Sequence, residues 1–476
     1  MGVAVRKYRD RILSGSIIRT ALWLGLPLMI VQVVQVSYNI ADAFWLSKYS
    51  DVAMAVPRQA WPPIMFFSAF SIALSSANLA LISQYVGAKE FRTASKVASK
   101  YFTASLTLGL LFGTAYLVLR PVIFTYAIRT PVEIRDEVIA YAGIIAFDVM
   151  ASYVVLAYST ILQSVGDTRR PAIVNGLTSL TNIILDPFLI LGIGPFPRLG
   201  VVGAAIATVS SRVLGAVTLF IMIERSYPDL RVRLTKDIGV EWVVTNLKIG
   251  LPVLVLVIAN SVAKMTQLRL VNTFGVVVAT AYSIGFIVMD LADASLRGFA
   301  RASAIMVGQS IGAGLKDRAR KIALKTSAFI LAATTVGAIV VYLLRNQLIW
   351  VFTQDPAIWA EAKEFLEIFV WSLPLFGVFI NAMLIGRGSG HTLPPTLIGI
   401  IRLWGCWVGI GYLLALYMGY GPLGIWVGMA LSNVFAGIAS LIWLKYGNWV
   451  RPVIRKHMPN MKAGTPARHK PSSFPH

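Results

Sequence analysis

Charged residues are scarce in this chain, and acidic residues are the scarcer kind. Only 13% of the 476 residues are charged, whereas a soluble domain has roughly 25%. Hydrophobic residues make up 57%, which excludes an ordinary soluble protein and predicts an all-α polytopic membrane protein. The 21 acidic residues stand against 43 basic ones. In a membrane protein this excess favours a topology signal over nucleic-acid binding.

Cysteine and histidine are scarce as well. The single Cys406 excludes a disulfide within the chain and a cysteine-based metal site. The four histidines lie mostly near the C-terminus and are a poor supply of general bases. No HExxH or P-loop pattern occurs. The sequence therefore does not predict an enzyme, a metal centre or a bound cofactor.

Twelve hydrophobic runs are separated by turn residues and charges. They lie near residues 17–46, 52–86, 95–119, 136–163, 171–194, 200–224, 242–271, 276–312, 320–344, 358–385, 394–419 and 421–446. Each is long enough to cross the hydrocarbon core of a bilayer, and the longer ones must tilt or protrude.

Basic residues are unevenly distributed between the two sides of these runs. They concentrate before the first run and after the even-numbered ones, for example at Arg6, Lys7, Lys96, Lys100, Arg169, Arg231, Lys316 and Lys445. By the positive-inside rule we expect a multi-pass protein of the cell membrane with both termini in the cytoplasm.

The chain repeats itself after about half its length. LPLMI around Pro27 recurs as LPVLV around Pro252, and SQYVGAK around Gln84 recurs as GQSIGAG around Gln309, each time with an offset of 225 residues. Each half contains an even number of spans, so the two repeats run in the same direction. Two such bundles leave a cleft between them, which favours a transporter over a single-bundle enzyme or channel.

This repeat predicts the domain organisation. A cytoplasmic segment at 1–16 precedes an N-lobe of six spans at 17–224. A cytoplasmic linker at 225–241 leads to a C-lobe of six spans at 242–446. The remaining 447–476 is rich in Pro, Ser and Lys, and we expect it to be a disordered cytoplasmic tail.

The first span carries a polar stripe that ends in a carboxylate. Its members stand at positions i, i+3, i+4 and i+7, namely Gln35, Tyr38, Asn39 and Asp42. A helix places them on one face. A charge inside a membrane is costly, so such a residue is a candidate functional group. Pro27 removes one helical hydrogen bond near the start of the stretch and allows a bend there.

A second polar group lies in the fifth and sixth spans. Asn182 and Asp186 share a helix face, and Thr208 offers a hydroxyl in the next span. Pro187 leaves a helical carbonyl free and allows its helix to bend. If Asp186 faces Asp42, repulsion and burial favour the protonated state, which suits a proton carrier. The same oxygens suit a hard monovalent cation, and both ions stay open. The alternative is that each acid has only a local structural role.

The second half lacks these paired acids. In the repeat Gln267 takes the place of Asp42, so a purely structural need of the fold does not account for the acids of the first half. Candidates to line a central substrate cleft are Gln35, Asn39, Asp148, Lys264, Gln267, Asp290 and Asp293. For the charges of the second half, a buried structural salt-bridge network is an equally good interpretation.

Four motifs together carry a family resemblance. They are YNIADAFW at Tyr38–Trp45, QSVGDTRRP at Gln163–Pro171, NIILDP at Asn182–Pro187 and GAAIAT at Gly203–Thr208. With the twelve runs and the repeat, the chain resembles a multidrug and toxic compound extrusion (MATE) transporter, and within that family the DinF-like and archaeal branch. The resemblance covers roughly residues 17–446.

The resemblance implies two lobes in a V shape around a central cleft. It also implies proton or sodium coupling through the N-lobe acids and the residues around them, here Tyr38, Asp42, Asn182, Asp186 and Thr208. Bending of the first helix on protonation is a proposal for that branch, and Pro27 is the matching residue. Acids of the second lobe bind cations in the NorM-like branch, but this chain has Lys264 and Gln267 at the corresponding span.

The sequence and the resemblance together predict a monomeric secondary antiporter. It would export amphipathic, often cationic drugs or metabolites across the membrane while H⁺ or Na⁺ enters. A lipid-linked precursor flippase of the same superfamily is the alternative, because Lys264, Arg297 and Arg301 are candidates for binding phosphates, although the acidic N-lobe argues against it.

Overall fold

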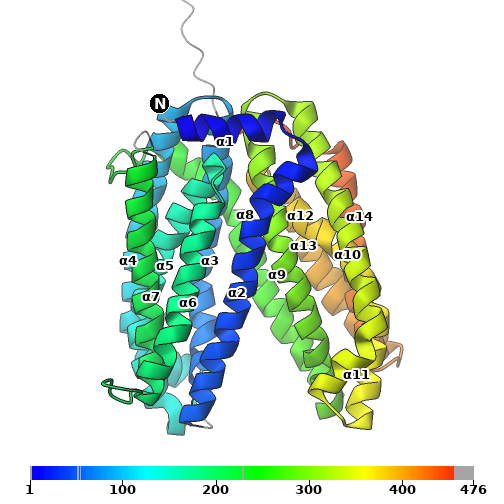
Figure 1. The fold of residues 1–476 in the computed structure, drawn as a ribbon. Coiled ribbons are helices and arrows are strands. Elements are labelled where there is room, and N and C mark those ends of the chain that lie inside the picture. Colours follow the sequence, from blue (N-terminus) through cyan, green and yellow to red (C-terminus); the bar gives the residue numbers. More distant parts are fainter. Residues whose placement is uncertain (1–2, 51–52, 54, 228–229, 455–476) are drawn as a thin grey trace, which may run out of the picture.

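The protein is all-helical (Figure 1). Its structure is a computed structural model that describes residues 3–50, 53, 55–227 and 230–454. Within these ranges, eleven helices are long and apolar enough to cross a membrane. The twelfth long helix, α9 (Val276–Gly312), has an apolar first part but carries Asp290, Asp293, Arg297 and Arg301 further along. The all-α polytopic fold is thus confirmed.

Six helices form the N-lobe. They are α2 (Ile17–Tyr49), α3 (Ala55–Gly87), α4 (Phe91–Val122), α5 (Val132–Val165), α6 (Arg169–Leu191) and α7 (Val201–Ser226). A short π-helical segment, Ile123–Ala127, extends α4. Both prolines that were predicted to allow bending lie inside helices, Pro27 in α2 and Pro187 in α6, and the bending itself stays a prediction.

The C-lobe repeats this arrangement with more irregular helices. It consists of α8 (Val240–Asn272), α9, α10 (Lys316–Phe352), α11 (Pro356–Phe369), α12 (Leu373–Ser389), α13 (Leu393–Ile400) and α14 (Pro422–Tyr446). A 3-10 segment, Val370–Ser372, joins α11 to α12 within one span, and π-helical segments at Ile401–Ile410 and Leu413–Tyr417 continue α13.

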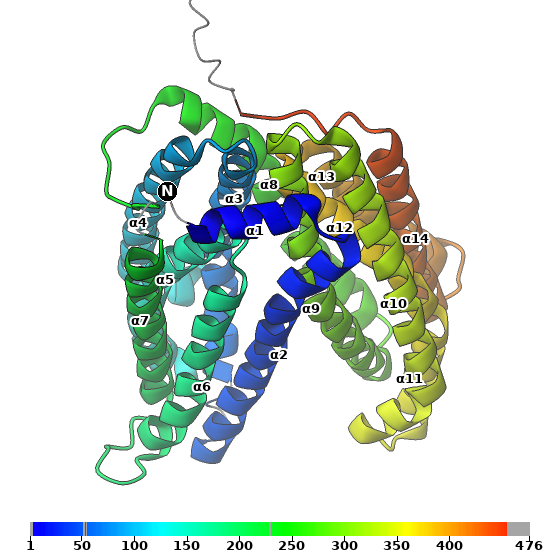
Figure 2. The same cartoon turned by 45° about the horizontal axis from the view of Figure 1, so that its top comes forward.

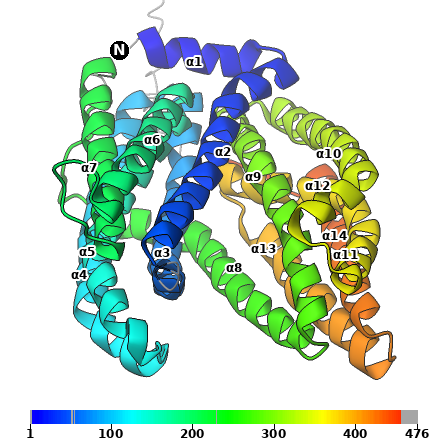
Figure 3. The ribbon, with the colours of Figure 1, turned by 60° about the horizontal axis from the view of Figure 1, so that its bottom comes forward.

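The two lobes meet at the end that carries the N-terminus and diverge toward the other end (Figures 1 and 3). Two helices make the connection, since α2 packs on both α6 and α9, and α3 packs on both α8 and α9. Apolar side chains cover the inside and the outside of each lobe: Trp426 and Tyr116 are fully buried, while Leu110 and Val118 are exposed. Exposed apolar side chains all round a helical bundle are what a surrounding bilayer requires.

Glycines set the closest approach between the lobes, where α3 and α9 end side by side. A Cβ on Gly87 would lie 2.0 Å from the carbonyl oxygen of Gln309, and a Cβ on Gly312 would lie 1.9 Å from that of Gln84. The positions correspond in the repeat, so the two lobes contact each other reciprocally. We call this contact of Gly87, Gly312, Gln84 and Gln309 the seam.

The glutamine side chains of the seam reinforce it from both sides. Gln84 donates from Nε2 to the Ser389 carbonyl over 3.0 Å, and Gln309 donates to the Ser164 carbonyl over 2.9 Å. Ser164 and Ser389 also correspond in the repeat. The pseudo-symmetry predicted from short sequence matches therefore extends to individual hydrogen bonds, and it confirms two related six-helix bundles.

A further helix, α1 (Val3–Ser14), lies across the end where the lobes meet (Figure 2). Arg9 donates from Nη2 to the Gly87 carbonyl of the N-lobe over 2.8 Å. Arg318 of the C-lobe donates to the Ile12 carbonyl over 2.8 Å and to that of Gly15 over 2.7 Å. The segment predicted at 1–16 therefore contains a helix tied to both lobes. Most of the predicted tail, 455–476, lies outside the described residues.

Candidate functional site

The N-lobe contains a cavity of about 460 Å³ between α2, α3, α5 and α7. Three residues of the predicted stripe, Gln35, Tyr38 and Asp42, line it from α2, and Thr208 lines it from α7. Helical periodicity brings the stripe to one face, as predicted. The side chain of Asn39, the fourth member, lies outside the described part of the structure.

A much smaller recess of about 20 Å³ adjoins this cavity. Tyr38, Asn182 and Thr208 line it. The Tyr38 hydroxyl lies 3.4 Å from Thr208 Oγ1. In the orientation that satisfies both ends of its amide, Asn182 donates to Asp186 Oδ2 over 3.2 Å and accepts from the Thr208 N–H over 3.1 Å. The recess is large enough for one water molecule or one small cation.

The two N-lobe acids lie close enough for their charges to interact. Asp186 is completely buried, and Asp42 is half-buried in the cavity wall. Each carboxylate has one buried oxygen, Oδ1, with no hydrogen-bond partner among the described residues. Buried polar atoms are normally paired, so a proton or a cation would complete both groups.

The C-lobe contains a control for this juxtaposition. Gln267, the counterpart of Asp42, is completely buried, and a Cβ on Gly411 would lie 3.8 Å from its Nε2. Gly411 corresponds to Asp186 in the repeat. Equivalent positions therefore face each other in the C-lobe too, but without acids. Gln267 lines neither the N-lobe cavity nor the C-lobe cavity, and its predicted place in the central cleft stays a prediction.

Asp148 has a partner that the sequence analysis did not identify. Its Oδ1 accepts from Arg212 Nε over 2.9 Å, and both side chains line the N-lobe cavity. Ser152 lies 3.4 Å from the other carboxylate oxygen. Arg212 stands four residues after Thr208 in an apolar span, and its intramembrane charge alone would have identified it.

A second cavity of about 560 Å³ lies in the C-lobe. The predicted cleft residues Lys264, Asp290 and Asp293 line it, together with Arg297. Asp293 accepts from Arg297 Nε over 2.6 Å, and Lys264 lies over the Phe286 ring at 5.6 Å. The charges of this lobe therefore form an ion pair and also line a cavity, while their role in binding substrate stays a prediction.

Trp61 and Met65 of α3 line both cavities. Neither is a charged or strongly polar residue inside an apolar run, so the sequence offers no reason to single them out.

Arg387 and Arg402 also line the C-lobe cavity. Arg387 reads as a loop residue after the tenth span, but α12 includes it. Arg402 lies inside the eleventh span and could have been found by its charge.

Within the described ranges, no group of three or more His, Cys, Asp or Glu side chains could hold a metal ion. The oxygen atoms that best suit ion binding are those around Asp186, and one acid, one amide and one hydroxyl supply them. That set suits a monovalent cation or a proton.

Comparison with known proteins gives consistent results. The chain is 28% identical to the probable multidrug resistance protein NorM of Thermotoga maritima over 90% of this chain and 93% of that protein. It is 28% identical to the probable multidrug resistance protein YoeA of Bacillus subtilis over 88% and 92%. A crystal structure of MATE in the bent conformation superposes with a TM-score of 0.84 at 23% identity, covering 92% of this chain and 96% of that one.

The MatE family model matches the chain twice, at residues 27–188 and 252–413. Corresponding ends of the two matches are 225 residues apart, which is the offset of the repeat. Since the two matches cover more than half of the sequence, the chain belongs to the MatE family, a family of multidrug and toxic compound extrusion transporters and not of enzymes.

Proposed function

We propose that this transporter is a secondary antiporter that exports amphipathic, cationic small molecules while H⁺ or Na⁺ enters through Asp42 and Asp186. The observation that carries the proposal is the pair of neighbouring carboxylates, each with a buried oxygen that has no partner among the described residues. Asp42 lines the N-lobe cavity, and Asp186 lies behind it. Multidrug resistance relatives support export of drug-like molecules. They do not favour the flippase alternative, and membership of the DinF-like and archaeal branch stays a prediction.

Coupling follows from competition for the same charge. With both carboxylates ionised, the cavity attracts a cationic substrate. A proton shared by the acids, or Na⁺ in the recess beside Tyr38, Asn182 and Thr208, cancels that attraction. The ion and the substrate then disfavour each other's binding by the same factor, which is the thermodynamic condition for exchange. The available oxygens suit either ion.

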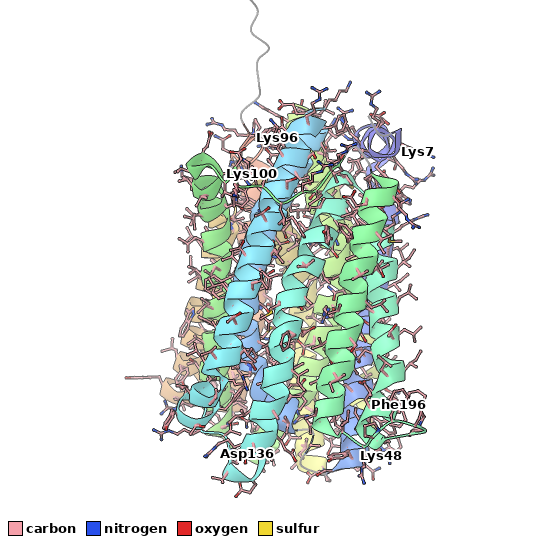
Figure 4. The ribbon with its side chains drawn as sticks, turned by 90° about the vertical axis from the view of Figure 1, so that its left-hand side faces the viewer. Lys7, Lys48, Lys96, Lys100, Asp136 and Phe196 are labelled. Carbon is pink, nitrogen blue, oxygen red and sulfur yellow. The ribbon has the colours of Figure 1, made fainter. Side chains whose placement is uncertain are left out.

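The orientation with both termini in the cytoplasm is part of the proposal. Lys7, Lys96 and Lys100 lie at the end where the lobes meet, whereas Lys48 and Asp136 lie at the opposite end (Figure 4). The positive-inside rule assigns the more basic end to the cytoplasm. The seam then closes the cytoplasmic side, the lobes diverge toward the outside, and transport requires the seam to open.

The test is efflux of a fluorescent cationic dye from proteoliposomes with a pH gradient or a Na⁺ gradient imposed, one at a time. We expect efflux with one gradient and its loss in Asp42→Asn, because the amide cannot take up a proton and carries no charge for Na⁺. Asp136→Asn is the matched control, since Asp136 is exposed near the start of α5.

Efflux at the wild-type rate in Asp42→Asn would refute the coupling assignment. Gln267→Ala should reduce efflux far less than Asp42→Asn, because the equivalent position in the C-lobe carries no acid. An equal loss would refute the argument from lobe asymmetry. Absence of efflux with either gradient would refute antiport of cationic dyes altogether.

A further inference from the structure

The C-lobe cavity carries more positive than negative charge. Four basic residues line it, Lys264, Arg297, Arg387 and Arg402, against two acidic ones, Asp290 and Asp293. The N-lobe cavity is balanced, with Arg58 and Arg212 against Asp42 and Asp148. A cationic substrate and its coupling acids account for the N-lobe cavity, but they leave the excess of guanidinium groups in the C-lobe unexplained.

Arg387 is the clearest case. Its Nε is buried and has no hydrogen-bond partner among the described residues. The charged groups that act on it are Arg297 and Arg301, both cations. Arg297 already pairs with Asp293. Arg301 donates only to the Thr160 hydroxyl, over 3.3 Å, and its own Nε is buried without a partner in the described part.

Arg402 adds a fourth guanidinium whose hydrogen bonds all go to a neutral residue. It donates from Nε and Nη2 to Asn433 Oδ1 over 3.1 and 2.9 Å. Its guanidinium carbon lies 4.9 Å from the ring centroid of Phe376 and 5.6 Å from that of Trp407. The amide and the rings hold the group in place, and the carboxylate whose charge acts on it is Asp293, which already pairs with Arg297.

Uncompensated guanidinium groups inside a membrane are expensive, and they are normally paired. Here Asp293 is the one described carboxylate paired with any of the four. Arginine forks fit carboxylate and phosphate groups through two parallel N–H···O bonds. The missing partner is therefore an anionic group that enters the cavity from outside the chain.

We propose that the C-lobe cavity binds the carboxylate or phosphate group of an amphipathic aromatic solute, so that anionic and zwitterionic compounds are also substrates. Arg387 and Arg402 hold the anionic group, with Lys264 at the exposed side. Phe376, Phe379 and Trp407 provide apolar walls for the aromatic body. The volume of about 560 Å³ lies within the range of small-molecule sites.

This inference depends on the proposed export function in one respect, namely that the bound anion is transported. The binding step can be measured without transport. The probes are three compounds with one aromatic body: 1-pyrenebutyrate, 1-pyrenebutanol and 1-pyrenebutyltrimethylammonium. Full-length protein in phosphatidylcholine nanodiscs is titrated with each, and energy transfer from tryptophan to pyrene reports binding.

Wild-type protein should bind pyrenebutyrate about tenfold or more tightly than pyrenebutanol, the size expected from one charge-assisted hydrogen bond. Arg387→Gln should abolish that preference. Lys264→Gln, at an exposed side chain whose replacement leaves the core untouched, should reduce it. Arg269→Gln is the matched control, because Arg269 is exposed on the same helix as Lys264 but does not line the cavity.

Equal affinity for the butyrate and the butanol in wild-type protein would overturn the proposal. So would an unchanged preference in both Lys264→Gln and Arg387→Gln. Soluble dihexanoylphosphatidylglycerol is added as a competitor, with dihexanoylphosphatidylcholine as its control. If dihexanoylphosphatidylglycerol binds more tightly than pyrenebutyrate and displaces it, the cavity would be reassigned to a lipid headgroup. If wild-type protein shows no dye efflux with either gradient but still prefers pyrenebutyrate to pyrenebutanol, the antiporter proposal is refuted and the anion site is retained.

Discussion

Arg212 and Asp148 form an ion pair inside the N-lobe, with 26% and 11% of their side chains exposed. Removing one member of such a pair leaves a buried charge without compensation, at a cost of about 3 kcal/mol or more. We therefore expect Asp148→Ala to lower the midpoint of thermal unfolding of the detergent-purified protein clearly. The combined change Asp148→Asn with Arg212→Gln should restore most of the loss, because no charge remains buried.

The two single variants Asp148→Asn and Arg212→Gln complete a double-mutant cycle that isolates the coupling of the pair. Asp136→Ala serves as the control, since Asp136 is exposed and its loss should leave the midpoint unchanged. If the double variant unfolds as early as Asp148→Ala, the two side chains are not energetically coupled and act in the cavity independently.

At the residue scale, the sequence predicted the sites that follow helical periodicity. Asp42 and Tyr38 share a cavity wall because their spacing puts them on one face of α2. The contact between Asn182 and Asp186 is local and was also predictable.

The partner of Asp148 was not predictable, because Arg212 stands 64 residues away and its identity depends on how α5 packs against α7. Sequence alone also does not place Gln267, since a polar residue in a span can face a glycine as well as a cleft.

At the scale of single elements, α1 is held by few contacts. Arg318 of α10 donates to the Ile12 and Gly15 carbonyls, and Arg9 of α1 donates to Gly87. Hydrogen bonds to charged groups contribute about 1.5–3 kcal/mol each. We expect Arg318→Gln to speed amide hydrogen exchange in α1 by about tenfold or more, because the helix detaches locally without unfolding the lobes.

The control is Lys316→Gln, which removes an exposed charge at the start of the same helix. Exchange in α10 itself should stay slow in both variants. Equal exchange of α1 in wild type and Arg318→Gln would mean that Arg9 and the stacking of Tyr8 on Trp23 suffice to hold the helix.

The twelve long helices were predictable because each needs a long apolar run and ends near turn residues or charges. The irregular parts of the C-lobe were not. The 3-10 segment Val370–Ser372 and the π-helical segment Ile401–Ile410 interrupt runs whose hydropathy is unbroken, and hydropathy carries no information on hydrogen-bond register. The helix α1 escaped prediction because its position depends on contacts with distant helices, made by Arg318 of α10 and by Arg9 with the end of α3.

At the scale of the whole molecule, the two lobes share one framework but differ in the charges of their cavities. The seam repeats the same contacts in both lobes, with Gln84 and Gln309 each bonded to a carbonyl of the opposite lobe. The cavities do not repeat, since paired acids occupy the N-lobe and guanidinium groups the C-lobe. A symmetric frame permits the lobes to rock about the seam, while asymmetric cavities allow the two lobes to bind ligands of different charge.

Closure of the seam requires the two glycines, and this gives a test of rocking. A Cβ on Gly87 would lie 2.0 Å from the Gln309 carbonyl oxygen, so Gly87→Ala should prevent α3 and α9 from meeting. In a Cys406→Ser background, a cysteine introduced by Ser83→Cys reports the seam, because Ser83 is completely buried there. A cysteine introduced by Trp61→Cys reports the open end, where Trp61 is 56% exposed.

In membranes, Gly87→Ala should raise the rate of maleimide labelling at Ser83→Cys and lower it at Trp61→Cys, because opening one end closes the other in a rocking transporter. Gly176→Ala is the control, since a Cβ on Gly176 meets nothing within 4 Å. Faster labelling at Ser83→Cys with unchanged labelling at Trp61→Cys would show local fraying of α3, and the rigid-body coupling of the two ends would then be refuted. Reciprocal changes would mean that a single methyl group at the seam shifts the balance between the two access states.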